Sequence, residues 1–133
     1  MGCQYESYSV DEGLSWTMPV PSRFTSPAAP MSMKRIPGSN KLLTVWNPVP
    51  NYNGRKTSTY GGRTPLVLAT CNDDGIDWNE PISIEDNPDA GYCYTAIHFL
   101  NDNHMLLAYC AGNEDGTGSQ NLMLRKIPIN ELP

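Results

Sequence analysis

The sequence predicts an all-β chain, and three observations support this fold class. Glycine and proline together account for 11 + 12 = 23 of the 133 residues, which suits short strands and turns better than long helices. Several segments alternate apolar and polar residues, and no segment repeats apolar residues at helical spacing over the length of a helix. One turn motif occurs twice, which indicates a repeated β-structure.

The repeated turn motif has the frame x-x-Asp-x-Gly-x-x-Trp. It covers residues 9–16 and again residues 71–78, with Asp11 and Asp73 as its two aspartates. The aspartate can accept hydrogen bonds from turn N–H groups, and the glycine can adopt a positive φ. The tryptophan can then anchor the next strand in an apolar layer. We therefore predict two hairpin turns between strands, with Trp16 and Trp78 buried.

About nine strands are expected around these turns. Residues 4–9 and 31–36 alternate, residues 41–46 and 64–70 are mostly apolar, and residues 82–84 alternate again. The two segments that follow, residues 92–100 and 104–110, flank an Asn-Asp-Asn turn and predict a hairpin. The last segment, residues 121–129, shifts its alternation part-way, which suggests a β-bulge. Two polar loops remain, residues 47–62 and 111–119, and the first is a candidate functional loop.

Charge and cysteine content argue against several classes of partner and cofactor. The formal net charge is −5 without a basic run, which disfavours nucleic acid and anionic membranes. The longest apolar run, residues 105–111, is shorter than the roughly 20 residues that span a bilayer. No signal peptide is recognised at the start, and no compartment is predicted.

The four cysteines form no metal-binding motif, so neither a metal nor another cofactor is expected. On the predicted hairpin, Cys93 and Cys110 could form a disulfide or remain two half-buried thiols.

The turn motif resembles the Asp box (S/T-x-D-x-G-x-T/S-W) of sialidases and related β-propellers with bacterial neuraminidase repeats. The first copy is nearly complete and holds Ser9, Asp11, Gly13, Ser15 and Trp16. The second copy keeps Asp73, Gly75 and Trp78, with Cys71 and Asp77 at the two hydroxyl positions. The resemblance covers nearly the whole chain and corresponds to the C-terminal portion of the family. It implies a single partial-propeller domain over residues 1–133, with two to three four-stranded antiparallel blades.

The resemblance also implies a substrate and a chemistry. Sialic acid carries a carboxylate on its anomeric carbon, which sialidases hold with three arginines. A tyrosine is the nucleophile, a glutamate accepts its proton and an aspartate is the general acid. Arg63 stands eight positions before Cys71, the first residue of the second box, and this is the place of the third family arginine. Tyr94 matches the nucleophile, and Tyr92 is the alternative, since strand alternation would place both on one face.

Further candidate substrate-binding residues each have a structural alternative. Arg35 lies in an Arg-Ile-Pro triplet like the family's N-terminal arginine motif, but its setting favours an ordinary strand arginine. Trp46 and Asn47 precede the first long loop, where the indole could stack on a sugar or pack in the core. Glu85 belongs to an acidic segment that is otherwise solvated, and its role beside Tyr94 is a hypothesis.

The other catalytic residues of the family are missing from these positions. The second arginine would fall at position 1, which is Met1, and the general acid belongs to blades that would precede this segment. Three functions therefore stay open: a sialidase-type glycoside hydrolase, a noncatalytic module that binds acidic glycans or other carbohydrates, and a truncated structural propeller fragment. About three blades fall short of the four to eight that close a propeller. We expect a head-to-tail homo-oligomer, with a trimer favoured over a dimer.

Overall fold

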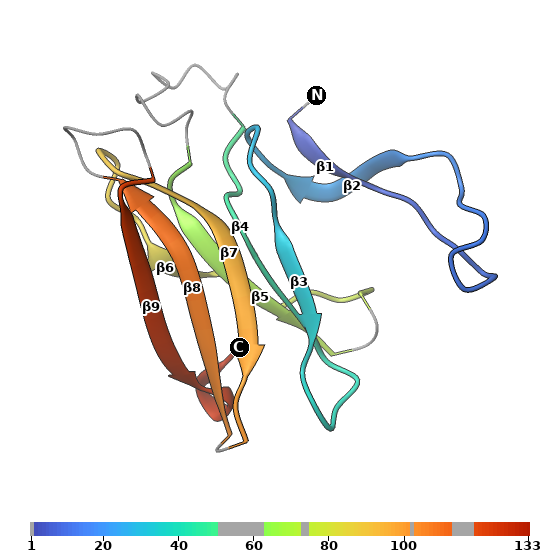
Figure 1. The fold of residues 1–133 in the computed structure, drawn as a ribbon. Coiled ribbons are helices and arrows are strands. Elements are labelled where there is room, and N and C mark those ends of the chain that lie inside the picture. The colour runs from blue at the N-terminus through green and yellow to red at the C-terminus, as the bar shows by residue number, and fades with distance from the viewer. Residues whose placement is uncertain (1, 51–62, 73–74, 102, 113–118) are drawn as a thin grey trace.

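The computed structural model describes residues 2–50, 63–72, 75–101, 103–112 and 119–133, and they form strands with one short 3-10 helix (Figure 1). The elements are β1 (Cys3–Glu6), β2 (Val20–Thr25), β3 (Ser32–Arg35), β4 (Leu42–Trp46), β5 (Leu66–Cys71), β6 (Ile82–Glu85), β7 (Gly91–Phe99), β8 (His104–Gly112), β9 (Asn121–Pro128) and η1 (Ile129–Glu131). The all-β prediction is confirmed.

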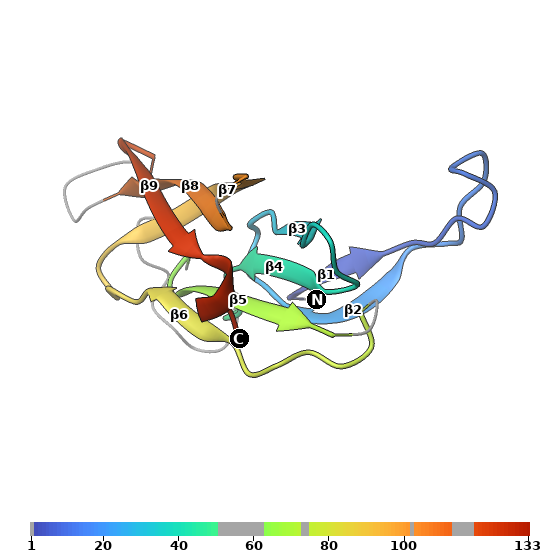
Figure 2. The same ribbon diagram turned by 90° about the horizontal axis from the view of Figure 1, so that it is seen from below.

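The strands form three antiparallel sheets. Sheet A holds β1 and β2, sheet B holds β3, β4, β5 and β6 in that order, and sheet C holds β7, β8 and β9. Figure 2 shows sheet B between sheets A and C. Sheet B is a complete four-stranded blade in which every strand pairs with its neighbour in sequence. The three sheets in succession form the partial propeller that the repeat predicts.

Sheet B is covered on both faces because its two middle strands carry apolar side chains in both directions. Leu43, Val45 and Leu68 are fully buried in the core that sheet B shares with sheet C. Trp46, Val67 and Ala69 point the opposite way and are packed against Phe24 of β2 and against Trp78. The apolar run of β5 therefore marks a strand that is buried from both sides.

The first strands of sheets B and C lie side by side. The Ser32 hydroxyl on β3 donates to the Thr95 carbonyl on β7 at 2.5 Å, and Lys34 Nζ donates to the Ile97 carbonyl at 3.1 Å. The arrowheads of β3 and β7 point the same way in Figure 1. Because the two strands run in the same direction, their starts lie toward the same end of the molecule.

The Asp boxes are turns, as predicted, where the structure describes them. In the first box, Ser9 Oγ accepts from the Gly13 N–H at 2.8 Å, and Asp11 accepts from the backbone and hydroxyl of Ser15 at 2.9 and 2.6 Å. These hydrogen bonds from Ser15, with a further one from Ser9, lower the pKa of Asp11 to about 2. In the second box, Cys71 Sγ takes the place of the serine oxygen and accepts from the Gly75 N–H at 3.1 Å.

The two box tryptophans have different surroundings. Both indole N–H groups donate to the box glycine, at 3.0 Å from Trp16 to Gly13 and 3.1 Å from Trp78 to Gly75. Trp78 also lies edge-on to Phe24, with 5.1 Å between ring centroids, and packs half-buried against the apolar layer predicted for it. The prediction is wrong for Trp16, which is 64% exposed because its hairpin projects away from the sheets (Figure 2). Asp73 lies outside the described residues.

Two local features differ from the sequence prediction: the presence of strand β2 and the position of the β-bulge. Strand β2 was not located from the sequence, because Pro19 and Pro21 give its start the composition of a loop. Strand β9 pairs with β8 in continuous register from Pro128 to Asn121, so the bulge predicted there is wrong. The irregularity of sheet C lies instead in β7, between Cys93 and Ala96. That position matters for the candidate site.

Candidate functional site

The candidate site forms at the segment that precedes β5, beside the start of β7. The Tyr92 backbone N–H donates to the Arg63 carbonyl at 2.8 Å, which ties the segment before β5 to β7. The Thr64 hydroxyl adds a second tie by donating to the Asn87 carbonyl at 2.9 Å. These contacts bring Arg63, in the segment before β5, to Tyr94 on β7.

The guanidinium of Arg63 is held from three directions. Nη1 donates to Cys93 Sγ and Nη2 donates to the Ala28 carbonyl, each at 3.3 Å. The guanidinium carbon lies 5.1 Å from the centroid of the Tyr94 ring, within the range of a cation–π contact. Partial burial disfavours the charged form, but the contacts with Tyr94 and Cys93 outweigh it and raise the pKa of Arg63. The site therefore holds a permanent positive charge in a fixed position.

Tyr94 and Tyr92 face different surroundings, which corrects the expectation that they share a face. Tyr94 has a φ of 54° within the irregular part of β7 and is 53% exposed. Tyr92 is 7% exposed and lies edge-on to Tyr109, with 6.3 Å between ring centroids. The bulge interrupts the alternation of the strand and turns Tyr94 toward Arg63. A positive φ in a non-glycine residue costs of order 1–3 kcal/mol, and such strain concentrates at functional positions.

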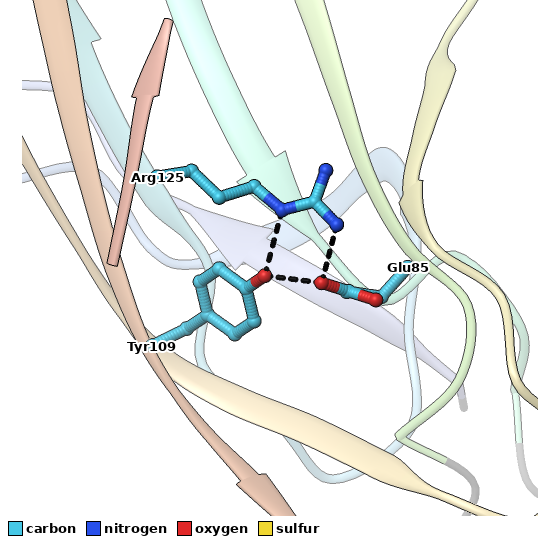
Figure 3. Close-up of polar contacts among 3 residues, drawn as sticks. All are labelled: Glu85, Tyr109 and Arg125. Atoms are coloured by element: carbon cyan, nitrogen blue, oxygen red, sulfur yellow. Dashed lines mark hydrogen bonds and ion pairs between the residues drawn. The ribbon is translucent and has the colours of Figure 1, made fainter. Parts of the chain in front are cut away.

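Glu85 contacts a different tyrosine from the one expected (Figure 3). Its Oε1 accepts hydrogen bonds from the Tyr109 hydroxyl and, at 2.6 Å, from Arg125 Nη2. Arg125 Nε in turn donates to the Tyr109 oxygen at 3.0 Å. Tyr109 is fully buried, and burial together with the bond to Glu85 raises its pKa to about 12. The three residues come from β6, β8 and β9, so they join sheet B to sheet C.

A comparison with family models decides the family. The model described as a BNR repeat-like domain matches residues 2–107, which include both Asp boxes, Arg63 and Tyr94. The chain belongs to the BNR repeat-like domain family. The similarity to sialidases and BNR propellers is thereby confirmed at the level of the family. No curated protein and no solved structure matches this chain.

Three further candidate substrate-binding residues of the BNR repeat-like domain do not contact Arg63 or Tyr94 in the described structure. Arg35 is exposed at the far end of β3, where its Nη1 donates to the Asn40 carbonyl at 3.0 Å. Trp46 is 6% exposed and lies edge-on to Phe24 at 5.3 Å, so it packs between sheets A and B. Asn47 is fully buried, and its Nδ2 donates to the Pro65 carbonyl at 2.9 Å. Asn47 therefore holds the segment between Arg63 and β5.

Sequence reasoning missed the two hydrogen-bond partners of Glu85, Tyr109 and Arg125. Both lie on the core-facing side of adjacent strands, since Tyr109 pairs with Met123 and Leu107 pairs with Arg125. The signal for Arg125 was a charged residue at a position that the alternation of β9 assigns to the inner face. The signal for Glu85 was a carboxylate at the end of a strand, which we assigned to the wrong tyrosine.

No metal or membrane feature is found within the described part of the chain. These residues contain no group of three or more histidine, cysteine or acidic side chains that could hold a metal ion. Among them there is also no helix with the length and apolar character needed to cross a bilayer. Cys93 and Cys110 occupy directly opposite positions on β7 and β8, as the hairpin predicted, and both are thiols rather than the two halves of a disulfide.

Proposed function

We propose that this BNR repeat-like domain binds an acidic glycan at the Arg63–Tyr94 site and does not hydrolyse it. The observation that carries the proposal is the guanidinium of Arg63, fixed 5.1 Å above the ring of an exposed, strained Tyr94. A planar guanidinium in a fixed orientation suits bidentate recognition of a carboxylate. The aromatic ring beside it suits the apolar face of a sugar.

The charge distribution supports a site for a single acidic group. The whole chain carries a net charge of −5, so a cation held at one end of β7 is a local exception. The contacts of Arg63 run to Cys93 Sγ and to the Ala28 carbonyl, neither of which is a carboxylate. They orient the guanidinium without neutralising it, which leaves its charge for a carboxylate ligand.

The position of Glu85 argues against hydrolysis by the isolated site. A tyrosine nucleophile needs a carboxylate close enough to accept its proton. Glu85, the candidate for this role, is hydrogen-bonded to Tyr109 and Arg125 instead. Within the described ranges, no carboxylate contacts Tyr94, and Arg63 is the only arginine that lies against it. Binding needs one cation and one ring, whereas hydrolysis needs groups that this part of the chain does not bring together.

A binding titration tests the proposal. A sialylated oligosaccharide and its desialylated counterpart are titrated into the protein by calorimetry or NMR. We expect the sialylated ligand to bind and Arg63→Ala to weaken it at least tenfold, because a charge-assisted contact is lost. Arg35→Ala is the matched control, since it removes an exposed arginine outside the site and should leave affinity unchanged. Equal affinity in the wild type and Arg63→Ala would overturn the site, and absence of binding would favour a structural fragment.

A separate activity assay tests the noncatalytic part of the proposal. A fluorogenic sialoside is incubated with the wild type and with Tyr94→Phe. We expect no release of the fluorophore above the buffer rate from either protein. Turnover by the wild type that disappears in Tyr94→Phe would identify a tyrosine-dependent glycoside hydrolase and would refute a purely binding role.

A further inference from the structure

Sheet C has an apolar face that no described part of the chain covers. Tyr92, Met105 and Tyr109 point into the core shared with sheet B, so the alternate residues point away from it. Cross-strand pairing places these outward residues in rows, with Cys110 opposite Leu122 and Ala108 opposite Leu124. We define the outer face of sheet C by Ala96, Leu106, Ala108, Cys110, Leu122 and Leu124.

The exposure of this face contrasts with its counterpart in sheet B. Leu122 and Leu124 on β9, the third strand of sheet C, are 76% and 64% exposed. Leu66 and Leu68 on β5, the third strand of sheet B, are 1% and 0% exposed because sheet C covers them. The repeat therefore gives sheet C the same apolar pattern that sheet B buries against a neighbouring sheet. Such a patch on a soluble domain marks an interaction surface.

A second exposed apolar surface lies on the hairpin that joins β1 to β2. We define the first-box hairpin as residues 7–19. Its exposed apolar side chains are Tyr8, Val10, Leu14, Trp16 and Met18, which range from 60% to full exposure. The segment is also acidic, because its charged residues are Asp11 and Glu12. The outer face of sheet C ends in a row formed by His98, Leu106 and Lys126, in which Lys126 carries a positive charge.

One chain cannot bring these two surfaces together. Figure 2 shows the first-box hairpin and sheet C at opposite ends of the molecule, with sheet B between them. We infer that the outer face of sheet C binds the β1–β2 hairpin of a second copy of this chain, head to tail. In this contact the exposed apolar side chains of the first-box hairpin pack against the outer face of sheet C. The acidic residues of the hairpin lie near the end of that face that carries Lys126.

The geometry of this contact fixes the type of assembly. A head-to-tail contact uses a different surface on each partner, so every added copy leaves one face and one hairpin free until a ring closes. A closed ring would cover every outer face, and the trimer that strand counting favours would have three times the 14.7 kDa mass of one chain. Two copies paired through identical surfaces would instead stop at a dimer and leave both hairpins exposed.

Light scattering on a size-exclusion column is the first test. We expect the wild type to elute as an oligomer that dissociates with dilution, and Leu122→Glu/Leu124→Glu to elute at the monomer mass of 14.7 kDa. Both leucines are exposed, so the substitutions leave the core intact, which circular dichroism can confirm. Ile76→Glu is the control, because Ile76 is 70% exposed and lies outside both surfaces. A monomeric wild type, or an oligomer unaffected by the double substitution, would overturn the inference.

Mixing two defective variants tests the head-to-tail arrangement itself. Leu14→Glu/Met18→Glu damages the hairpin and Leu122→Glu/Leu124→Glu damages the outer face, so each variant alone should be monomeric. A mixture should form a dimer with twice the 14.7 kDa mass of one chain, since one intact hairpin can still meet one intact face. A hairpin variant that dimerises by itself would show face-to-face pairing and would refute the head-to-tail contact, as would a mixture that stays monomeric.

Discussion

Replacing Tyr109 by phenylalanine removes one hydroxyl from the contact between sheets B and C. Tyr109 is completely buried, and its hydroxyl is hydrogen-bonded to the carboxylate of Glu85 and to the guanidinium of Arg125. Phenylalanine keeps the ring and its edge-on contact with Tyr92. The substitution therefore isolates the hydrogen bonds from the packing of the aromatic side chain.

The expected loss follows from the charge and exposure of the two partners. A hydrogen bond to a charged group contributes about 1.5–3 kcal/mol to the free energy of unfolding. The Glu85 side chain is 18% exposed, so little water can replace the lost hydroxyl there. The Arg125 side chain is 43% exposed and can recover part of its hydrogen bonding from water, which reduces its share. We therefore expect Tyr109→Phe to lower the free energy of unfolding by about 2–3 kcal/mol.

Urea unfolding followed by circular dichroism measures this change. The midpoint should fall while the slope of free energy against urea stays constant, because the surface exposed on unfolding is nearly unchanged. Tyr5→Phe is the matched control, since Tyr5 is 52% exposed and should change stability by less than about 0.5 kcal/mol. A loss of less than about 0.5 kcal/mol for Tyr109→Phe would refute the view that this hydroxyl joins the two sheets.

The remaining predictions concern protonation and a turn. The pKa of Tyr109 is raised from 10 to about 12, so between these pH values the unfolded chain has lost this proton while the folded chain keeps it. The free energy of unfolding should therefore fall as the pH rises from 10 to 12. Urea midpoints should show this fall for the wild type, and Tyr109→Phe should lack this part of it. The pKa of Asp11 is lowered from 3.8 to about 2, so its contribution to the stability of the turn is present above pH 4 and lost toward pH 2. NMR titration of the Asp11 carboxyl group should give a midpoint near pH 2, and this midpoint should rise in Ser15→Ala. Gly75 has a φ of 99°, so Gly75→Ala should destabilise the domain by about 1 kcal/mol or more in urea unfolding, whereas no loss would show that the turn tolerates a side chain.

The regular part of the fold could be predicted because its signals are local. The Asp-box frame specifies a turn through hydrogen bonds between near neighbours in sequence, from Ser9 to Gly13 and from Asp11 to Ser15. The apolar run of β5 likewise identifies a buried strand without knowledge of its partners. Strand β2 lacked such a signal, because it depends on pairing with β1 rather than on its own composition.

The candidate site was only partly predictable because its geometry depends on tertiary contacts. The spacing before the second box located Arg63, and the start of a strand located Tyr94. The assignment of Glu85 failed because residues on β6 meet the core-facing residues of β8 and β9, and no sequence spacing specifies that packing. Trp16 was misplaced for a related reason, since its burial depends on a neighbour that this hairpin does not have within the described chain.

The bulge in β7 connects the fold to the proposed binding site. A regular strand would place Tyr92 and Tyr94 on one face, where both would enter the core or both would leave it. Because the register shifts after Cys93, Tyr92 can pack against Tyr109 while Tyr94 lies against Arg63. The same segment thus supplies a core aromatic and an exposed aromatic in close succession. The positive φ of Tyr94 is the cost of this arrangement, and the contact with a fixed guanidinium is the feature that a purely structural strand would not need.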